Sequence, residues 1–402
     1  MYIAVFTHYM HPDALTNSRL LLDAAIGFVD RGHRVRFLSA KPMSKGLEPE
    51  LPESLSITRH WAPRLDRRGI KRRLLISSVV AGLVFIRLLF SRKPDVVLVD
   101  TVMPLQGLCV WAVSKLRGHK YVYLASELFP DAAVALNALR PGGFVTRIWD
   151  FTNRLVYGGA SAVIVIGPRL REKVARHLTG GMEDHKLHVV HNWADPDEMK
   201  PVSKSDNWWI KEQGYEGKFI VLYSGNMGLS HDLGTLVEAA DILRDEEKLQ
   251  IVLIGEGPSK AELVSEVDRR QLPNVAFLPY QPAEVLPFSL TSGDLSVVTL
   301  APRMDELTIP SKLYPAMAGG QAILALVGPG TEVGEMTIEH GIGIRVSQGD
   351  VAGLVSELSR LLADSDQVEE MKVRSRRVFE ENYTRDHSIS AYVSILEEVA
   401  GP

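Results

Sequence analysis

The stretch YSGNMGLSHDLGTLVEAADIL, Tyr223–Leu243, decides the fold. An apolar strand ends in Ser224–Asn226, a glycine-containing loop follows, and the pattern predicts a helix that opens near His231 or Asp232. Small residues let the backbone approach a ligand closely, and the free N–H groups of a helix start favour an anion. The alternative interpretation is a tight strand-to-helix turn capped by Asp232. Both interpretations predict a strand–helix unit of an α/β domain.

The same alternation of strands and helices runs along the whole chain and predicts mostly parallel, doubly wound sheets. One of the expected helices is Ser18–Arg31. A polar stretch from Asp195 to Glu216 separates two such halves. We therefore expect two Rossmann-like domains that face a central cleft, 1–198 and 199–384, and a final helix, about 385–400, long enough to return to the first domain. The expected strands are Ile3–Thr7, Val35–Ser39, Val96–Val99, Tyr121–Ala125, Val163–Ile166, His188–His191, Ile220–Ser224, Ile251–Ile254, Val275–Leu278, Leu295–Leu300 and Ala322–Leu326.

Composition restricts the class of protein. The 402 residues are 46% hydrophobic and 23% charged, as in ordinary globular proteins, and the net charge of −4 gives no reason to expect nucleic acid. Cys109 is the only cysteine, so a disulfide framework is excluded and a reducing compartment is favoured. The first residues, Met1–Thr7, indicate a strand rather than a signal peptide.

The segment LLISSVVAGLVFIRLLF, Leu74–Phe90, is nearly continuous apolar sequence that Arg87 interrupts. It is shorter than the ~20 residues that a spanning helix needs. One interpretation is a buried helix with solvated basic ends. The other is an interfacial helix whose cations meet anionic headgroups, and both hold if one face is core and the other is lipid. The cations that precede the segment are Arg64, Arg67, Arg68, Lys71, Arg72 and Arg73.

Further candidate loops follow strands of the second half. IGEGP at 254–258 and FLPYQP at 277–282 each follow an expected strand, and ELTIPSKLYPAMAGGQAILA at 306–325 predicts a short helix that begins near Lys312. We expect Ser311 to cap this helix and Gly319-Gly320 to end it. Neither Gly-x-Gly-x-x-Gly nor a P-loop occurs, so these loops match no dinucleotide or P-loop fingerprint.

The order of SGN-x-G, IGEGP, NVAFLPY, SGDLSVVTL and PSKLYPAMAGGQAIL resembles the nucleotide-binding half of retaining glycosyltransferases of family 4, which have the GT-B fold. The segment THYMHPDALTNSRLLLDAAIGFVDRGHRVRFLSA is similar to their first strand, loop and helix, and SELFPDAAVAL is similar to an Asp-Leu-Trp-Pro element of the fucosamine-transferase branch. That branch builds bacterial surface polysaccharides on a lipid diphosphate carrier at the inner membrane face. The resemblance covers nearly the whole chain.

The sequence departs from the family pattern at the donor site. Many members hold the donor diphosphate with an Arg and a Lys, and the matching positions here are Asn226 and His231. Many also carry two glutamates, whose positions here are Leu307 and Pro315, with Glu306 one residue from the first. Lys312 remains as the obvious cation. The expected donor-binding residues are Ser224, Gly225, Asn226, His231, Gly255, Glu256, Tyr280, Glu306, Pro310, Ser311 and Leu313.

We assign the catalytic roles to Lys312, which would stabilise the leaving diphosphate, and to Glu127 or Asp131, which would orient or deprotonate the acceptor hydroxyl. Glu127 and Asp131 could share one helix face, or they could be a capping pair around Pro130. The expected acceptor-side residues are His8, Asn17 and Arg19, with Asn17 or Ser18 as the alternative N-cap of the first helix. The expected membrane-contact residues are Arg67, Arg68, Arg72, Arg73, Leu83 and Phe85.

The resemblance implies a glycosyltransferase that moves a sugar from a nucleotide diphosphate donor to a polyprenyl-diphosphate-linked saccharide in capsule, O-antigen or exopolysaccharide synthesis. UDP is the favoured base and GDP the next, with an N-acetylated 6-deoxyhexose as a candidate sugar. We expect no cofactor and no essential metal, and a cytoplasmic protein bound peripherally to the inner face of the plasma membrane. The alternatives are a nucleotide-sugar epimerase and a non-catalytic membrane-bound sensor of sugar nucleotides.

Overall fold

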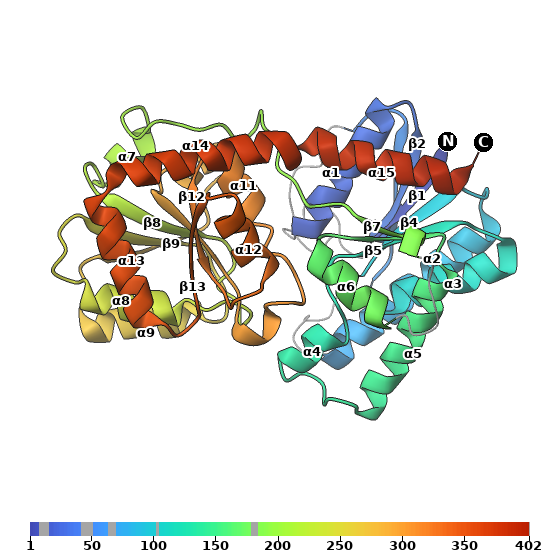
Figure 1. Ribbon diagram of the computed structural model, residues 1–402. Helices are drawn as coiled ribbons and strands as arrows, with labels where there is room; N and C mark the ends of the chain where they lie inside the picture. Colours follow the sequence, from blue (N-terminus) through green and yellow to red (C-terminus); the bar gives the residue numbers. More distant parts are fainter. Residues whose placement is uncertain (8–15, 42–50, 63–69, 102–103, 178–183, 402) are drawn as a thin grey trace. The chain divides into compact units, whose positions relative to one another are not determined.

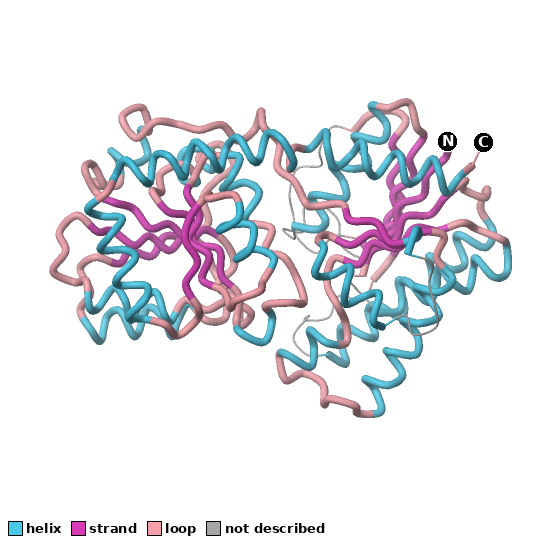
Figure 2. Tube along the Cα trace, in the orientation of Figure 1, coloured by secondary structure: helices cyan, strands magenta, loops and turns pink. Residues whose placement is uncertain are grey.

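The computed structural model describes residues 1–7, 16–41, 51–62, 70–101, 104–177 and 184–401. The chain forms two compact units (Figure 1). The first comprises Met1–His191 together with Asp386–Pro402, and the second comprises Asn192–Arg385. Each unit contains a parallel sheet with helices on both faces (Figure 2). The two doubly wound α/β units confirm the predicted fold class.

In the described part of the first unit, seven strands form a parallel sheet in the order β3-β2-β1-β4-β5-β6-β7. The order reverses between β1 and β4, which is the topological switch point where open α/β sheets bind ligands. Strands such as VVLVD and YVYLA are buried along their whole length, because helices cover both faces. The strands are β1 (Tyr2–Phe6), β2 (Arg34–Ala40), β3 (Leu55–His60), β4 (Val96–Asp100), β5 (Tyr121–Ala125), β6 (Ala162–Val165) and β7 (Leu187–Val189).

The helices of the first unit pack as neighbours along the sheet, and α3 contacts both α2 and α5. The last helix, α15, lies against α1, where Ile389 occupies the space above Gly27 and the rings of Phe28 and Tyr392 lie 6.3 Å apart (Figure 1). The helices are α1 (Thr16–Asp30), α2 (Ile70–Phe90), α3 (Pro104–Arg117), α4 (Asp131–Ala135), α5 (Phe144–Gly159), α6 (Pro168–His177), the 3₁₀ turn η1 (Asp184–Lys186) and α15 (Arg385–Ala400).

The second unit contains six described strands in the order β10-β9-β8-β11-β12-β13, all parallel. They are β8 (Phe219–Ser224), β9 (Leu249–Ile254), β10 (Val275–Leu278), β11 (Leu295–Thr299), β12 (Ala322–Leu326) and β13 (Gly343–Val346). The helices are α7 (Trp208–Glu212), α8 (Gly234–Ile242), α9 (Lys260–Arg270), α10 (Leu286–Leu290), η2 (Pro302–Met304), α11 (Leu313–Ala318), α12 (Glu332–Glu339), α13 (Val351–Ala363) and α14 (Ser365–Asn382).

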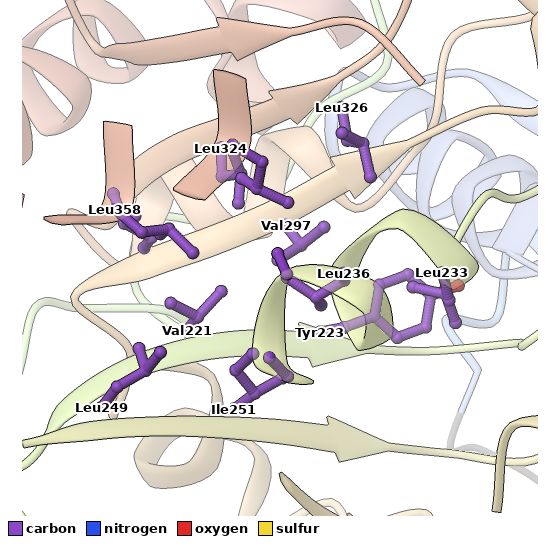
Figure 3. Packing of buried hydrophobic residues seen from close by; sticks show 14 of the residues in the cluster. Val221, Tyr223, Leu233, Leu236, Leu249, Ile251, Val297, Leu324, Leu326 and Leu358 are labelled. Carbon is purple, nitrogen blue, oxygen red and sulfur yellow. The ribbon is translucent and has the colours of Figure 1, made fainter. Parts of the chain in front are cut away.

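The larger core cluster of the second unit lies between one face of its sheet and the helices α8 and α13. Alternate strand residues such as Val221, Ile251 and Leu324 point into this layer and meet Leu236 of α8 and Leu358 of α13 (Figure 3). The intervening residues, such as Leu222 of β8, pack on the opposite face. Burial on both faces explains why these strands are apolar without alternation.

Three local predictions were wrong. The edge strands β3, Leu55–His60, and β13, Gly343–Val346, were not predicted. The first helix begins at Thr16, so Asn17 and Ser18 are helical residues rather than its N-cap. The N-cap of α11 is Lys312 without a side-chain capping bond, so Ser311 does not cap that helix.

Candidate active site

The candidate donor site lies at the carboxyl ends of the strands of the second unit. After β8 the chain turns at Gly225, where φ is +142°, and after β9 it turns at Gly255, where φ is +137°. Gly225 N donates to Ile254 O at 2.9 Å, and Gly255 N donates to Leu278 O at 2.9 Å. A Cβ on Gly255 would lie 2.0 Å from Gly225 O. The two turns are therefore in backbone contact that only glycine permits.

Lys312 reaches this pair of turns from the start of α11. A Cβ on Gly225 would lie 2.3 Å from the Cε of Lys312, so the lysine stem passes directly over the glycine. The ammonium lies 3.2 Å from His231 Nε2 and 4.8 Å from the centre of the Tyr223 ring. Burial lowers the pKa of Lys312 to about 8.

Among the described residues, Lys312 forms no ion pair with a carboxylate. A mostly buried lysine without an acidic partner is costly to hold in its charged form. Such a cation is well placed to bind an anion that reaches the turn of Gly225.

His231 supports Lys312 as a neutral imidazole. Burial, followed by the charge of Lys312, lowers the pKa of His231 to about 3. An ammonium can only donate, so Nε2 of His231 accepts from Lys312 and the ring proton resides on Nδ1. The phenol of Tyr223 donates to Asn226 O at 2.6 Å and fixes the loop beside the lysine. The structure thus brings together the predicted residues Gly225, Asn226, His231 and Lys312.

The helix after this loop begins at Gly234 with Leu233 as its N-cap, and the side chain of Asp232 bonds to its first turn. Asp232 Oδ1 accepts from Thr235 N at 3.2 Å, and Oδ2 accepts from the Thr235 hydroxyl at 2.6 Å. Asp232 therefore holds the first turn of α8 through Thr235, as the prediction of a capping role required, but the N-cap position itself belongs to Leu233. Gly228 makes room for the neighbouring side chains, because a Cβ there would lie 2.8 Å from Asn226 Nδ2.

Glu256 and Tyr280 lie at the ends of β9 and β10. The carboxylate of Glu256 pairs with Lys260 at 2.7 Å, and Lys260 also donates to Gly255 O at 2.9 Å. Tyr280 is 54% exposed, and partial burial raises the pKa of its phenol. An exposed ring beside a backbone turn can stack on a planar group.

The loop before α11 is held by a residue that the sequence reasoning missed. Asp305 Oδ2 accepts from Gly328 N at 3.0 Å, and Oδ1 accepts from Gln348 Nε2 at 2.8 Å. Burial raises the pKa of Asp305. The neighbouring Glu306, which was predicted as a donor contact, is exposed. Asp305 therefore fixes the segment between β11 and α11.

The other predicted residues of this loop differ in exposure. Pro310 and Leu313 are buried, and Ser311 is partly buried. Ser224, at the end of β8, is also partly buried. Of this group, Leu313 contributes to the buried side of α11.

In the first unit, Glu127 and Asp131 follow β5. The helix α4 begins at Asp131 with Pro130 as its N-cap and no side-chain capping bond, so Glu127 precedes the helix. The predictions of a shared helix face and of a capping pair were both wrong. Both side chains are partly buried, and the charge of Asp131 contributes to the raised pKa of Tyr157.

Sequence reasoning also missed a buried polar cluster at the carboxyl ends of β1, β4 and β5. Thr7 donates to Asp100 Oδ2 at 2.7 Å, and the hydroxyls of Thr101 and Ser126 lie 3.2 Å apart. All four residues are at least 95% buried. The cluster lies at the switch point of the sheet, where a ligand of this unit is expected.

The remaining predicted residues belong to the first unit. Arg19 and Arg72 are exposed, whereas Leu83 and Phe85 of α2 are partly buried. Asn17 and Arg73 lie within α1 and α2. His8, Arg67 and Arg68 lie outside the described residues.

Two family models match the chain. Residues 18–193 match the model described as a glycosyl transferase 4-like domain, and residues 218–364 match the model described as glycosyl transferases group 1. The chain is 25% identical over 340 residues to the probable glycosyltransferase WbjE of Pseudomonas aeruginosa, which covers 83% of this chain and 82% of that protein. It is 27% identical over 352 residues to the putative colanic acid biosynthesis glycosyl transferase WcaI of Escherichia coli, with 83% and 85% covered.

Solved structures share the fold. Sucrose-phosphate synthase from Thermosynechococcus elongatus superposes with a TM-score of 0.81 at 16% identity, over 99% of this chain and 98% of that one. HepE of Anabaena, crystallised with UDP, superposes with a TM-score of 0.74 at 13% identity, over 98% and 99%. The chain therefore consists of a glycosyl transferase 4-like domain followed by a group 1 glycosyl transferase domain, in the GT-B fold.

Proposed function

We propose that this glycosyltransferase moves a sugar, with retention of anomeric configuration, from a UDP-sugar to a polyprenyl-diphosphate-linked saccharide. The observation that carries the proposal is Lys312, a mostly buried ammonium without a carboxylate partner among the described residues, directly above the turn of Gly225. A diphosphate would supply the missing negative charge.

Lys312 and the backbone of the Gly225-Asn226 turn would hold the donor diphosphate. As the bond between the sugar and the diphosphate breaks, its electron pair leaves with UDP, and the negative charge on the leaving oxygen grows. A positioned cation and backbone N–H groups stabilise that charge more than they stabilise the intact donor, which lowers the barrier. Neutral His231 accepts a hydrogen bond from Lys312 and keeps the ammonium aimed at one place.

The acceptor hydroxyl attacks on the face from which the diphosphate leaves and loses its proton. We assign the orientation of this hydroxyl to Glu127 or Asp131, because each carboxylate follows a buried strand at the carboxyl edge of the first sheet. A carboxylate there can accept the proton directly or through water. No step requires a metal ion in this proposal, since Lys312 supplies the positive charge.

UDP is favoured because HepE, which has the same fold, was crystallised with UDP. The polysaccharide pathway is favoured because WcaI is named for colanic acid biosynthesis. An N-acetylated 6-deoxyhexose remains our candidate sugar from the fucosamine-transferase resemblance. A polyprenyl-linked acceptor would require the enzyme to work at the inner face of the plasma membrane.

Thermal unfolding with UDP, GDP, dTDP and ADP sugars tests the donor. We expect UDP-sugars to raise the Tm, because a ligand that binds only the folded state stabilises it by mass action. The absence of stabilisation by every nucleotide would contradict an enzyme that uses nucleotide sugars.

Transfer to a lipid-linked acceptor tests the reaction and the site. We expect Lys312→Ala and Glu127→Ala each to reduce transfer, and nuclear magnetic resonance of the product to show the anomeric configuration of the donor. Inversion would refute retention. Full activity of both variants would refute the site, and conversion of the donor without acceptor would indicate an epimerase.

A further inference from the structure

Helix α5 exposes a row of large apolar side chains. Phe144, Ile148 and Phe151 are 80%, 48% and 60% exposed, and their spacing of four and three residues places them on one face of the helix. Val145, 48% exposed, widens the row. Single exposed apolar residues are normal on a protein surface, but a contiguous row on one helix face marks an interaction site.

The buried face of the same helix is mixed, with the polar side chains of Thr146 and Asn153 ahead of Val156 and Tyr157. Thr146 and Asn153 are only 7% and 8% exposed. The hydroxyl of Thr146 donates to Arg140 O at 2.7 Å, and Asn153 Nδ2 donates to Phe129 O at 2.6 Å. In the first half of α5 the buried side chain is the polar Thr146, whereas the apolar Phe144, Ile148 and Phe151 are exposed, which is the reverse of an ordinary surface helix. Packing of the unit does not explain why its outer face is apolar.

Three arginines accompany the apolar row. Arg140 precedes α5, and Arg147 and Arg154 lie seven residues apart on the helix, so both flank the row on the same side. All three are exposed, and among the described residues none of them forms a salt bridge. The only acidic residue of α5 is Asp150, which is partly buried. The outer face of α5 is therefore both apolar and positively charged.

We propose that the outer face of α5 inserts into the surface of an anionic lipid bilayer. Phe144, Ile148 and Phe151 would enter the boundary between headgroups and acyl chains, and the arginines would contact anionic headgroups. An apolar row beside unpaired cations is the pattern of interfacial helices. The first half of α5 and the loop before it lie at the periphery of the first unit (Figure 1).

This inference rests on the proposed function, because a lipid-linked acceptor is presented at a bilayer. The loop that carries Glu127 is tied to α5 by the hydrogen bond from Asn153 to Phe129 O and by the ring of Trp149, which stacks on Phe129 at 5.5 Å. A helix fixed in the membrane surface would hold this loop close to the headgroups. The same contact would thus bring the acceptor-side residues to a membrane-bound acceptor.

The surface on α5 differs from the one predicted from sequence on α2. Val80, Val84 and Leu88 of α2 are buried, so one face of that helix belongs to the core of the unit, whereas Leu75, Ile86 and Phe90 are 52%, 55% and 80% exposed. Within the described residues, no helix combines the length and the apolarity needed to cross a bilayer. The α5 face can be separated from the α2 segment by mutation, since the two share no residue.

Flotation of the full-length protein with vesicles tests the inference. The vesicles contain either phosphatidylcholine alone or phosphatidylcholine with phosphatidylglycerol. We expect the protein to float with the anionic vesicles. In the variant Phe144→Ser/Ile148→Ser/Phe151→Ser, the partition coefficient between vesicles and buffer should fall more than tenfold. Neutralising Arg140, Arg147 and Arg154 with Gln should weaken partition by about fivefold for each cation, or roughly 100-fold in total, and added salt should weaken it further.

The matched control is Ile242→Ser/Ile338→Ser/Val373→Ser, which removes three equally exposed apolar residues from the second unit. This control should float like the unchanged protein. Unaltered flotation of the α5 variants, or loss only on charge reversal at Arg72 and Arg73, would overturn the inference. Loss of a concentration-dependent dimer in the Ser variant, measured by light scattering, would assign the face to a second copy instead.

UDP binding separates this inference from the proposed function. Stabilisation by UDP and transfer to a soluble acceptor analogue should survive in both α5 variants, whereas transfer to an acceptor in anionic vesicles should fall. Failure of UDP binding in the unchanged protein would refute the proposed function without affecting the flotation result.

Discussion

Replacing Lys312 by methionine should make the protein more stable and less able to bind its donor. The pKa of Lys312 falls from 10.5 to about 8 on burial. At ~1.4 kcal/mol for each tenfold change in proton affinity, folding with a charged Lys312 costs about 3 kcal/mol. Methionine has a similar length and carries no charge, so Lys312→Met removes this cost.

The substitution also removes favourable contacts. The cation–π contact with Tyr223 and the hydrogen bond to His231 each contribute about 1 kcal/mol. The expected net gain in the free energy of unfolding is therefore about 1 kcal/mol at pH 7. Because the folded pKa lies below the unfolded pKa, the unfavourable contribution is complete below pH 8 and disappears as the pH rises from about 8 to 10.5. The variant should lose its advantage over that range.

Donor affinity should change in the opposite direction. The loss of a charged hydrogen bond to the diphosphate should weaken UDP binding by roughly 10- to 100-fold. The proposed function has UDP bound to the protonated lysine of the unchanged protein, so its affinity should fall about tenfold for each pH unit above about 8, with proton uptake on binding. Calorimetric titration at pH 7 to 9 in buffers of different ionisation enthalpy measures both quantities.

The matched control is Lys204→Met. Lys204 is also a partly buried lysine, but it pairs with the buried carboxylate of Asp294, which accepts from Ile220 N at 2.7 Å at the beginning of β8. Its replacement should destabilise the protein, because a buried charge loses a partner, and should leave UDP affinity unchanged. If Lys312→Met lowered stability at pH 7 and bound UDP as tightly as the unchanged protein, the reasoning about a buried cation awaiting a diphosphate would be refuted.

Four further outcomes are expected. Gly225→Ala should weaken UDP binding at least tenfold and lower the free energy of unfolding by about 1–3 kcal/mol, because its Cβ meets the side chain of Lys312 and its φ is positive. The control is Gly158→Ala, whose Cβ lies in open space within α5. Urea unfolding of this control should show an unchanged or slightly higher stability. Gly255→Ala should be more destabilising than Gly225→Ala, because its Cβ meets backbone, and equal urea midpoints would contradict this order. Asp305→Ala should lower the free energy of unfolding by about 1–3 kcal/mol and raise the KM for the nucleotide sugar, because Gly328 N and Gln348 Nε2 lose their hydrogen-bond acceptor. An unchanged KM would show that Asp305 does not position the donor site. Chelation of metal ions by EDTA should leave the rate of sugar transfer unchanged. If EDTA lowered the rate and Mg²⁺ restored it, Lys312 alone would not supply the positive charge that stabilises the leaving diphosphate.

The strands could be predicted from the sequence because most are buried on both faces. YVYLA at Tyr121–Ala125 has the predicted bounds, since a short apolar run between turns has few other interpretations. The edge strand LSITRH at Leu55–His60 was missed because it is partly exposed and carries polar residues throughout. Its place in the sheet depends on pairing with β2, which no local pattern reveals.

The donor loops could be located from the sequence, but their contacts could not. Lys312 was singled out as a cation at a helix start, yet its bond to His231 joins residues 81 positions apart and depends on the order of the strands. Asp305 was missed because its partners, Gly328 and Gln348, come from loops that only the parallel sheet brings together.

The apolar face of α5 was missed for a different reason. Thr146, Arg147 and Asn153 interrupt its apolar residues, so the sequence pattern is that of an ordinary amphipathic helix. Only the burial of each side chain in the structure shows which face of the helix points inward. The longer run in α2 drew the prediction of a membrane contact because it is continuous. One face of α2 packs in the core, since Ile76, Val80 and Val84 are buried, but Leu75, Ile86 and Phe90 are exposed, so the membrane contact of α2 stays a prediction.

The pairing of α15 with α1 has a consequence for synthesis on the ribosome. The first unit comprises Met1–His191 and the segment from Asp386 onward, so its final helix is made only after the whole second unit. Until then Phe28 lacks the ring of Tyr392, and Arg31 lacks its partner Asp386. The nascent first unit must therefore persist without the cover of α15 over Gly27 and Phe28 while about 190 residues emerge, at about 5–20 residues per second. This interval lasts roughly 10–40 seconds and ends only when α15 has emerged and can pack on α1.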